Sequence, residues 1–344
     1  MKPIRVGIVG AGENTRLRHI PGLQAIDGVE IVSVANRRRE SSEKVAKEFG
    51  IPVVYDSWEE LVKAEDTDTI VIGTWPYLHC PVTLMALEAG KHVMTEARMA
   101  MNVEEARAML AASEKHPKLV TQVVPSPFSL GVDRTLQRLL KDGHLGDLLA
   151  VEVQAWTGSF LDQDSPMHWR QDVEFSGVNI MTLGIWYEAV MRWMGEASKV
   201  QAHGQIFVKS RKDPITGEVK EVKVPDHLVV TAEMECGAMA TFQISNITGG
   251  MPGNDAQLFG NRGTILVTGG ELFGCTPEHP QFSKIQIPHE EAGGWRVEEE
   301  FINAIRGVEK ISHTTFANGV KYMKFTEAVN RSLQSGAQVS LSEI

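Results

Sequence analysis

The sequence predicts two domains of mixed α/β class, the first with a parallel sheet and the second with a large, mainly antiparallel sheet. The chain has 344 residues, more than one ordinary hydrophobic core accommodates. Strand-like and helix-like segments alternate up to residue 125, and after it strands follow strands with few helices between them. We therefore expect domains at residues 1–125 and 126–344, with closing helices that can pack back on the first domain.

Composition and charge exclude several classes of protein. The net charge of −10 argues against nucleic acid as a partner. No apolar run approaches the ~20 residues that cross a bilayer, and a strand at the start leaves no room for a signal peptide. Three cysteines lie far apart, so neither a disulfide framework nor a metal site is expected. These features predict a cytoplasmic protein that has neither nucleic acid nor a membrane as partner.

Gly10 and Gly12 directly follow the first predicted strand, in the stretch RVGIVGAGENTRLR. Gly10 permits a tight turn, and Gly12 lets the backbone approach a pyrophosphate. The helix that starts near Asn14 offers its N-terminus to the phosphates. Thr15 stands where the dinucleotide motif usually has its third glycine or an alanine. The position of the turn favours a Rossmann dinucleotide-binding domain over a glycine-rich turn without a ligand.

The second predicted strand, residues 29–35, ends at Asn36, which is followed by Arg37 and Arg38. An acidic residue at this point binds the ribose 2′-hydroxyl of NAD and repels the 2′-phosphate of NADP. A neutral asparagine removes that repulsion, and arginine suits a phosphate by charge and shape. The predicted cofactor is therefore NADP or NAD, with NADP bound at least as well. A solvated basic helix start is the alternative interpretation.

Two further loops of the first domain follow predicted strands at residues 69–74 and 92–95. Ligands bind at the carboxyl ends of parallel strands, so both loops are expected to face the cofactor. For His79 a structural role at a helix start is the favoured alternative, and Glu96 is expected to orient its loop. The predicted cofactor contacts from these loops are Thr74, Trp75, Pro76, His79 and Glu96. Other elements of this domain are predicted at residues 40–49, 53–55, 58–64, 82–89, 102–116 and 119–124.

The second half is predicted to form a sheet, one long helix and two closing helices. Residues 177–194 predict the long helix, residues 209–225 a polar hairpin or loop, and residues 297–307 and 320–335 the closing helices. The strands are predicted at residues 149–156, 199–208, 229–235, 238–245, 257–260, 263–268 and 285–287.

Several stretches in this order resemble the Gfo/Idh/MocA family of oxidoreductases, named for glucose-fructose oxidoreductase, inositol dehydrogenase and rhizopine catabolism. They are GIVGAG, IVIGTWPYLHCPVTLMALEAGKHV, EARMAMN, LLKDGHLGDLLAVEVQ and EEFINAIRG, and together they cover nearly the whole chain. The resemblance implies a Rossmann domain followed by a domain with a mostly antiparallel sheet. It also implies a nicotinamide cofactor, usually a sugar or polyol substrate, and a homodimer or homotetramer built on that sheet.

The sequence departs from the family where the chemistry is expected. Family members usually carry Glu-Lys-Pro after the fifth strand, with the lysine contacting the substrate and the nicotinamide ribose. Here the aligned residues are Glu96, Ala97 and Arg98. The family's general base, a histidine on the long helix, aligns with Trp186, and the aspartate before it aligns with Thr182.

We expect the substrate pocket between the loop 96–99 and one face of the long helix. Asn179, Thr182 and Trp186 share that face, none of which titrates near neutrality. Trp169 and Trp186 offer faces on which sugar rings could stack, although ordinary packing is the commoner role. The predicted substrate contacts are Arg98, His168, Trp169, Asn179, Thr182 and Trp186.

Three residues are candidates for the missing catalytic groups. His168 could act as a base without a pKa shift, and a role as a surface or packing histidine fits the sequence equally well. Tyr187 adjoins Trp186, but it lies ~100° around the helix and fits a core aromatic about as well. Arg98 cannot be a base, but it could bind a carboxylate or phosphate of the substrate.

Three functions remain open at this point. One is an NAD(P)-dependent oxidoreductase that acts on a sugar, polyol or related cyclic alcohol with a rearranged proton-transfer apparatus. Another is a redox-neutral lyase, hydrolase or epimerase that regenerates its nicotinamide. The last is a catalytically silent cofactor-binding sensor or scaffold.

Overall fold

The computed structural model describes residues 2–344, which form two compact units. One unit contains residues 2–125 and 296–323, and the other contains residues 126–295 and 324–344. The chain therefore leaves the first unit, returns to it and ends in the second. No helix among residues 2–344 is long and apolar enough to span a membrane.

The first unit is built on a six-stranded parallel sheet with the strand order β3-β2-β1-β4-β5-β6. The order changes direction between β1 and β4, and in sheets of this kind ligands bind at the carboxyl ends of the strands at such a switch point. This arrangement confirms the predicted Rossmann domain. The strands are β1 (Ile4–Val9), β2 (Val29–Ala35), β3 (Val53–Val54), β4 (Thr69–Ile72), β5 (His92–Thr95) and β6 (Thr121–Val123).

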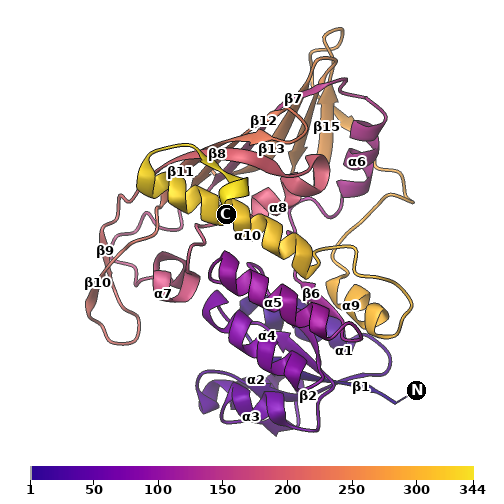
Figure 1. The fold of residues 1–344 in the computed structure, drawn as a ribbon, viewed down its shortest axis with the longest axis vertical. Coiled ribbons are helices and arrows are strands. Elements are labelled where there is room, and N and C mark those ends of the chain that lie inside the picture. Colours follow the sequence, from indigo (N-terminus) through magenta and orange to yellow (C-terminus); the bar gives the residue numbers. More distant parts are fainter. Residues whose placement is uncertain (1) are drawn as a thin grey trace. The chain divides into compact units, whose positions relative to one another are not determined.

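Short helices connect these strands (Figure 1). Ser57 and Asn102 cap α3 and α5 by accepting hydrogen bonds from the backbone amides three residues later. Helix α4 packs between α3 and α5, and α1 packs against α9. The helices of this unit are a π-helical turn (Thr15–His19), α1 (Ile20–Gln24), α2 (Arg39–Phe49), α3 (Trp58–Lys63), α4 (His79–Glu88), α5 (Val103–Lys115) and α9 (Val297–Ile305), with a 3-10 turn at Pro76–Leu78.

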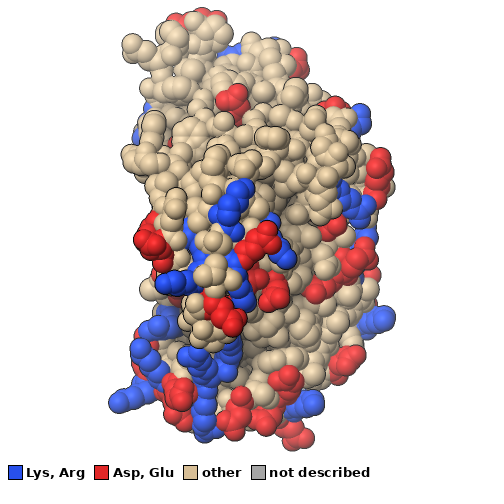
Figure 2. Space-filling model, turned by 90° about the vertical axis from the view of Figure 1, so that its left-hand side faces the viewer, with Lys and Arg blue, Asp and Glu red and all other residues tan. Residues whose placement is uncertain are grey.

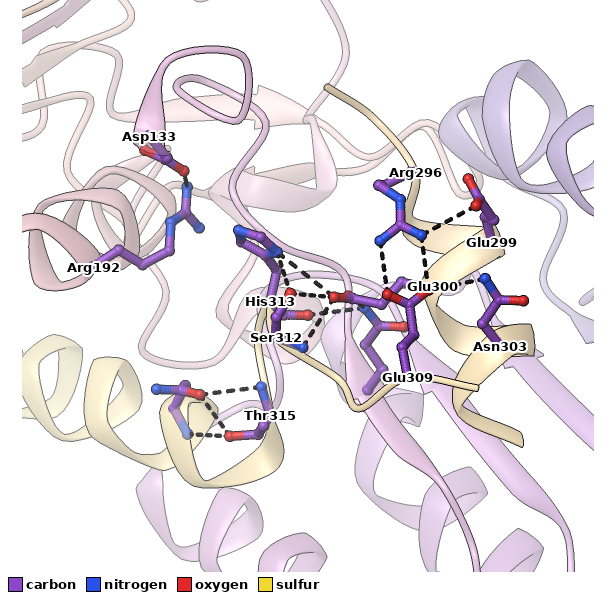
Figure 3. A network of polar contacts seen from close by, with 12 residues as sticks. Asp133, Arg192, Arg296, Glu299, Glu300, Asn303, Glu309, Ser312, His313 and Thr315 are labelled. Atoms are coloured by element: carbon purple, nitrogen blue, oxygen red, sulfur yellow. Dashed lines mark hydrogen bonds and ion pairs between the residues drawn. The ribbon is translucent and has the colours of Figure 1, made fainter. Parts of the chain in front are cut away.

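A buried polar network fixes α9 and the loop after it within the first unit (Figure 3). The carboxylate of Glu300 accepts hydrogen bonds from Gln122 Nε2 at 2.7 Å and from the backbone amide of Ser312 at 2.9 Å. Arg296 pairs with Glu309 at 2.7 Å. Because Gln122 lies in β6, these contacts tie the returning segment to the edge of the parallel sheet.

The second unit contains a nine-stranded sheet with the order β16-β15-β14-β13-β7-β12-β11-β8-β17. Only β7 and β12 pair in parallel, so the predicted mainly antiparallel sheet is confirmed. A separate hairpin, β9 (Ser210–Lys212) with β10 (Val219–Glu221), occupies the predicted polar segment. The strands of the sheet are β7 (Leu148–Trp156), β8 (Ala197–Gln205), β11 (His227–Met234), β12 (Met239–Ser245), β13 (Gly253–Gly260), β14 (Thr264–Thr268), β15 (Glu271–Cys275), β16 (Ser283–Ile285) and β17 (Val339–Ser340).

Helices cover one face of this sheet and leave the other open. Tyr187 of α8 (Leu183–Met194) stacks on Phe325 of α10 (Phe316–Ser335) with ring centroids 3.6 Å apart. Both rings contact Phe242 of β12. Along each strand buried residues alternate with more exposed ones, as expected for a sheet packed on one side. Two smaller helices, α6 (Asp133–Lys141) and α7 (Val173–Ser176), complete the unit.

The predicted long helix over residues 177–194 is wrong in its first part. Gly177 adopts a φ of 61° and ends α7, and α8 begins only at Leu183. The side chain of Asn179 donates a hydrogen bond to the carbonyl of Ser176 at 2.7 Å. Such local side-chain bonds compete with helix formation, which explains the interruption.

This interruption separates the residues that were predicted to share one helical face. Asn179 lies before α8, Thr182 occupies its N-cap position without a capping side-chain bond, and Trp186 lies within the helix. The predicted face therefore does not form as one surface of a regular helix.

Candidate functional site

The turn after β1 has the close backbone approach that the glycine pattern predicts. Gly10 adopts a φ of 82°, and a Cβ atom there would lie 2.4 Å from Thr74 Cγ2. A Cβ atom on Gly12 would lie 3.1 Å from the carbonyl oxygen of Gly73. The ends of β1 and β4 thus meet at the switch point of the sheet, where a side chain at Gly10 would not fit.

Thr15, at the usual third glycine position, is accommodated by another residue without a side chain. Its hydroxyl lies 3.4 Å from the carbonyl of Gly10, and a Cβ atom on Gly73 would lie 2.0 Å from that hydroxyl. In the usual motif, a small residue on the helix leaves room for the strand. Here the residue without a side chain is Gly73, in the loop after β4, and it leaves room for Thr15. The departure from the motif leaves the cradle for a dinucleotide intact.

Asn36 holds the glycine turn from the end of β2. Its Oδ1 accepts a hydrogen bond from the amide of Ala11 at 2.7 Å, and its Nδ2 donates to Ser41 Oγ at 3.1 Å. Arg37 and Arg38 are exposed, and their side chains form no hydrogen bond or ion pair with other residues in 2–344. Two exposed guanidinium groups therefore lie just after the end of β2, where the ribose of a dinucleotide is expected.

The loop after β4 is fixed by His79, which is fully buried. Its Nδ1 lies 2.9 Å from the carbonyl of Arg98 and its Nε2 lies 3.0 Å from the carbonyl of Thr74. Burial lowers the pKa of His79 below its ordinary value. Because both ring nitrogens contact backbone, His79 ties the loops after β4 and β5 together. This is the structural role given as the favoured alternative, rather than a direct cofactor contact.

The other predicted residues of the loop after β4 differ in exposure. Pro76 is buried, whereas Trp75 and Tyr77 are half-buried with their ring centroids 6.5 Å apart. The pKa of Tyr77 is raised by burial and lowered by the nearby charge of Arg37, with burial the larger effect. Arg37 and the aromatic pair therefore border the same edge of the sheet.

A buried charge network links the loops after β1 and β5, which are predicted to contact the cofactor. His19 Nδ1 lies 2.5 Å from Glu298 Oε1, and His19 Nε2 lies 3.0 Å from Glu96 Oε1. Glu96 Oε1 also accepts a hydrogen bond from Asn14 Nδ2 at 2.5 Å. The side chains of His19, Glu298 and Glu96 are 0%, 5% and 15% exposed. Asn14 and Glu96, both predicted to contact the cofactor, are thus in direct contact.

Electrostatics in this network favour charged side chains. Burial lowers the pKa of His19, but the hydrogen bonds that the ring donates to Glu298 and Glu96 outweigh it and raise the pKa to about 9. Burial likewise opposes the charge on Glu96, but His19 and Asn14 hold its pKa below the usual range. Sequence reasoning missed His19 and Glu298, because no local spacing links two residues that lie 279 positions apart.

Ala97 and Arg98 follow Glu96 in the loop after β5. Arg98 is 1% exposed, a depth at which a guanidinium needs compensating partners within the protein. The next residue, Met99, donates its amide hydrogen to Tyr322 Oη of α10. This loop is therefore anchored on both sides, by Glu96 and by Met99, with Ala97 and Arg98 between.

Tyr187 and Trp186 are core residues of the second unit, which corrects their predicted roles. Tyr187 is fully buried, its hydroxyl accepts a hydrogen bond from the amide of Ala197 at 2.9 Å, and burial raises its pKa strongly. Trp186 stacks on Phe128 with centroids 4.7 Å apart and donates to Asn254 Oδ1 at 3.0 Å. Neither side chain offers a base or a free stacking face to a ligand.

His168 is exposed, in the segment that leads to α7, and it begins a 3-10 turn, Trp169–Gln171. Its Nδ1 accepts a hydrogen bond from the amide of Arg170 at 3.2 Å, so the neutral ring carries its proton on Nε2. Partial desolvation and the charge of Arg170 lower the pKa of His168 to about 4. At neutral pH His168 is therefore a hydrogen-bond donor toward solvent and not a base. The guanidinium of Arg170 covers one face of Trp169 at 4.2 Å from its centroid.

The predicted site residues thus fall into the two units. The first unit brings the predicted cofactor residues together at one edge of its sheet and also holds Arg98. The second unit holds the other predicted substrate residues, of which Asn179 is buried and Thr182 is half-buried.

Comparison with known proteins agrees with this architecture. Residues 4–123 match the NAD-binding Rossmann-fold model of the GFO/IDH/MocA oxidoreductase family, and residues 134–266 match the model of the family's C-terminal domain. The chain belongs to the Gfo/Idh/MocA family. It is 25% identical over 278 residues to glucose-fructose oxidoreductase domain-containing protein 1 of Mus musculus, covering 80% of this chain and 69% of that protein.

Other members of the family carry names of specific activities. The chain is 28% identical over 272 residues to trans-1,2-dihydrobenzene-1,2-diol dehydrogenase of Mus musculus, covering 77% of this chain and 74% of that enzyme. Among solved structures, levoglucosan dehydrogenase in complex with NADH and L-sorbose has a TM-score of 0.85 at 20% identity, with 98% of each chain covered. An oxidoreductase domain protein from Kribbella flavida has a TM-score of 0.86 at 21% identity, covering 99% of this chain and 100% of that one. These structures share the fold.

Proposed function

We propose that this family member is an NAD(P)-dependent oxidoreductase that transfers a hydride to or from a sugar, a polyol or a related cyclic alcohol. The observation that carries the proposal is the intact dinucleotide cradle, in which Asn36 holds the turn of Gly10 and Gly12 at the switch point. The nicotinamide supplies the hydride chemistry when it is bound. The protein then has to hold the pyrophosphate at Gly12 and Asn14, and to fix the loop at Glu96 near the carboxyl end of β5.

The substrate class is supported by relatives and by the second unit's own residues. The names of related proteins include a cyclic diol and an anhydrosugar as substrates. In this chain, His168 presents an N–H group at the surface and Trp169 lies next to it, with ring centroids 5.6 Å apart. A donor beside an aromatic ring suits a hydroxylated ring compound, because such ligands combine apolar faces with hydroxyl groups.

A second candidate is a protein that binds the cofactor without net turnover. It is favoured because none of the predicted positions supplies a base: Ala97 cannot titrate, Trp186 and Tyr187 are core residues, and His168 is a donor at neutral pH. A redox-neutral lyase, hydrolase or epimerase remains a further alternative. In such an enzyme the cofactor is regenerated within each turnover.

We further propose that the protein is cytoplasmic and assembles into a homodimer or homotetramer through the open face of its nine-stranded sheet, with neither nucleic acid nor membrane as partner. Met239 on that face is 53% exposed, and Phe259, Leu266 and Phe273 add apolar surface on neighbouring strands. Figure 2 shows acidic and basic side chains next to one another on one side of the molecule, a distribution that does not favour a polyanion there.

The test is a substrate screen with NADPH, NADH and their oxidised forms, followed by absorbance at about 340 nm. A sustained change with at least one sugar, polyol or cyclic diol is expected. Substrate conversion without a net absorbance change would favour the redox-neutral alternative. Calorimetric cofactor binding without any conversion would favour the silent protein. No binding of either nucleotide would contradict all three functions.

A further inference from the structure

We infer that His19, held as an imidazolium between Glu96 and Glu298, is a positioning residue that keeps both cofactor-facing loops in their binding conformation, and that dinucleotide affinity falls when His19 loses this charge. The inference rests on the proposed function only in assuming that a nicotinamide dinucleotide binds at this edge of the sheet. His19 itself is buried beneath the loops and has no surface that a ligand could contact.

The geometry of the ring requires two protons. Nδ1 faces Glu298 at 2.5 Å and Nε2 faces Glu96 at 3.0 Å. Carboxylate oxygens only accept hydrogen bonds, and a neutral imidazole has a single N–H group. Only the imidazolium therefore donates to both partners. His79 also faces two acceptors, but they are uncharged carbonyls and burial lowers its pKa. The negative charge of both partners is therefore what distinguishes His19.

Glu96 transmits the position of His19 to both loops. Its Oε1 accepts from the side chain of Asn14 at 2.5 Å, and its Oε2 accepts from the amide of Ala97 at 3.2 Å. Asn14 is the N-cap residue of the turn that follows the glycines, and Ala97 continues the loop after β5. One carboxylate thus fixes the pyrophosphate loop and the loop near the expected nicotinamide, and His19 fixes that carboxylate.

Glu298 prevents the network from relaxing. It lies on α9, and a Cβ atom on Gly22 would lie 3.0 Å from its carboxyl carbon, so α1 and α9 are in close contact at this point. The charged groups that face His19 are Glu96 from the end of β5 and Glu298 from α9, with the Asn14 amide at 3.3 Å and His79 acting on Glu96 from the loop after β4. Glu298 therefore stays in place when the ring changes charge.

Loss of the second proton leaves one carboxylate facing a lone pair. That contact is repulsive in a buried site, so Glu96 must move and release Asn14 or Ala97. The pKa of His19 is raised from 6.5 to about 9, so the arrangement is complete near pH 7 and is lost as the pH rises through about 9. If the release of one proton from His19 disrupts binding, the cofactor affinity should fall by up to about tenfold for each pH unit above the break.

The first experiment measures the dissociation constant of NADPH from about pH 7 to about pH 10.5 by calorimetry. The wild-type protein and His144→Gln, a change at an exposed histidine of the second unit, should share a break near pH 9. His19→Gln should bind NADPH about tenfold more weakly at pH 7 and show no break. Wild-type affinity that stays constant up to pH 10, or a break that survives in His19→Gln, would overturn the inference.

The second experiment moves the break without removing the histidine. Glu298→Gln is nearly isosteric and removes one of the two charges that raise the pKa of His19, so the break should shift about one unit or more toward lower pH. Glu299→Gln, on the same helix but exposed and paired with Arg296, should leave it unchanged. A purely structural role for the network predicts no such shift.

A third measurement separates this inference from the proposed function, because it needs no cofactor. Side-chain 15N spectra of histidines near pH 8 should contain the signal of a doubly protonated ring that is absent in His19→Gln. If this signal is present and no nucleotide binds at any pH, the proposed function is wrong. If nucleotides bind but His19 is neutral at pH 8, the inference alone is wrong.

Discussion

Even a small side chain at Gly12 should weaken cofactor binding strongly. A Cβ atom at this position would already be 3.1 Å from the carbonyl of Gly73, and the two branches of valine would extend into the space of the pyrophosphate. Gly12→Val should weaken NADPH binding at least about tenfold while the circular dichroism spectrum stays unchanged. Gly294→Val, where a Cβ atom meets nothing within 4 Å, is the control. Equal affinities of both variants would exclude the glycine turn as the binding site.

Arg37 and Arg38 should determine how tightly NADPH binds. Their guanidinium groups have no ion-pair partner within residues 2–344, so a 2′-phosphate would meet no internal competitor. NADPH should bind at least as tightly as NADH, and the double change Arg37→Ala with Arg38→Ala should weaken NADPH binding about 10- to 100-fold with little effect on NADH. Arg39→Ala, whose side chain pairs with Glu43 at 2.9 Å, is the matched control. More than tenfold tighter binding of NADH to the wild-type protein would contradict this prediction.

Single residues were predictable from the sequence where their role is local. Gly10 and Gly12 follow from the turn that they make, and Asn36 follows from its place at the end of β2. The role of Asn36 as an acceptor for the amide of Ala11 was not predictable, because it depends on the approach of two strand ends. Trp186 shows the same limit, since its partners Phe128 and Asn254 come from distant parts of the chain.

Hairpin β9–β10 holds the segment that precedes His168. Arg211 of β9 is 3% exposed and donates to the carbonyl oxygens of Phe160 and Asp162, each at 2.6 Å, and of Ser165 at 3.0 Å. Arg211→Met should lower the free energy of unfolding by about 2–4 kcal/mol, because it leaves carbonyl groups without a charged donor.

The same change should make the segment 157–168 sensitive to limited proteolysis. Lys212→Met is the control, because Lys212 is exposed and contributes only its backbone carbonyl, to the amide of Met167 at 2.8 Å. Identical urea denaturation curves and cleavage patterns for the two variants would show that the hairpin does not hold this segment.

Element types were largely predictable, but one element boundary was not. The sequence pattern located most strands of the nine-stranded sheet, and also α3 and α5 of the first unit. Helical periodicity extended across residues 177–182, where Gly177 and the side-chain bond of Asn179 interrupt the helix. The parallel pairing of β7 with β12 was also not predictable, because the sequence of neither strand shows which distant strand it pairs with.

For the whole molecule, the open face of the large sheet predicts self-association. The protein should elute as a dimer or larger assembly in size-exclusion chromatography with light scattering. Leu266→Arg, at the middle of β14, should shift it toward the monomer, because a buried guanidinium without a partner is costly. Val308→Arg, at a residue of the first unit that is 71% exposed, should not. A monomeric wild-type protein at micromolar concentration would contradict this proposal.

The return of residues 296–323 to the first unit limits how the molecule can be divided. A polypeptide that ends at residue 125 would lack Glu298 and Glu300, and would leave the side chains of His19 and Gln122 without these partners in an incomplete core. Transplanting the cofactor-binding half into another protein therefore requires a splice that joins residue 125 to residue 296. In such a chimera residues 126–295 are an insertion that is removed. The second half of α10 then needs new apolar residues to pack against, because it belongs to the second unit.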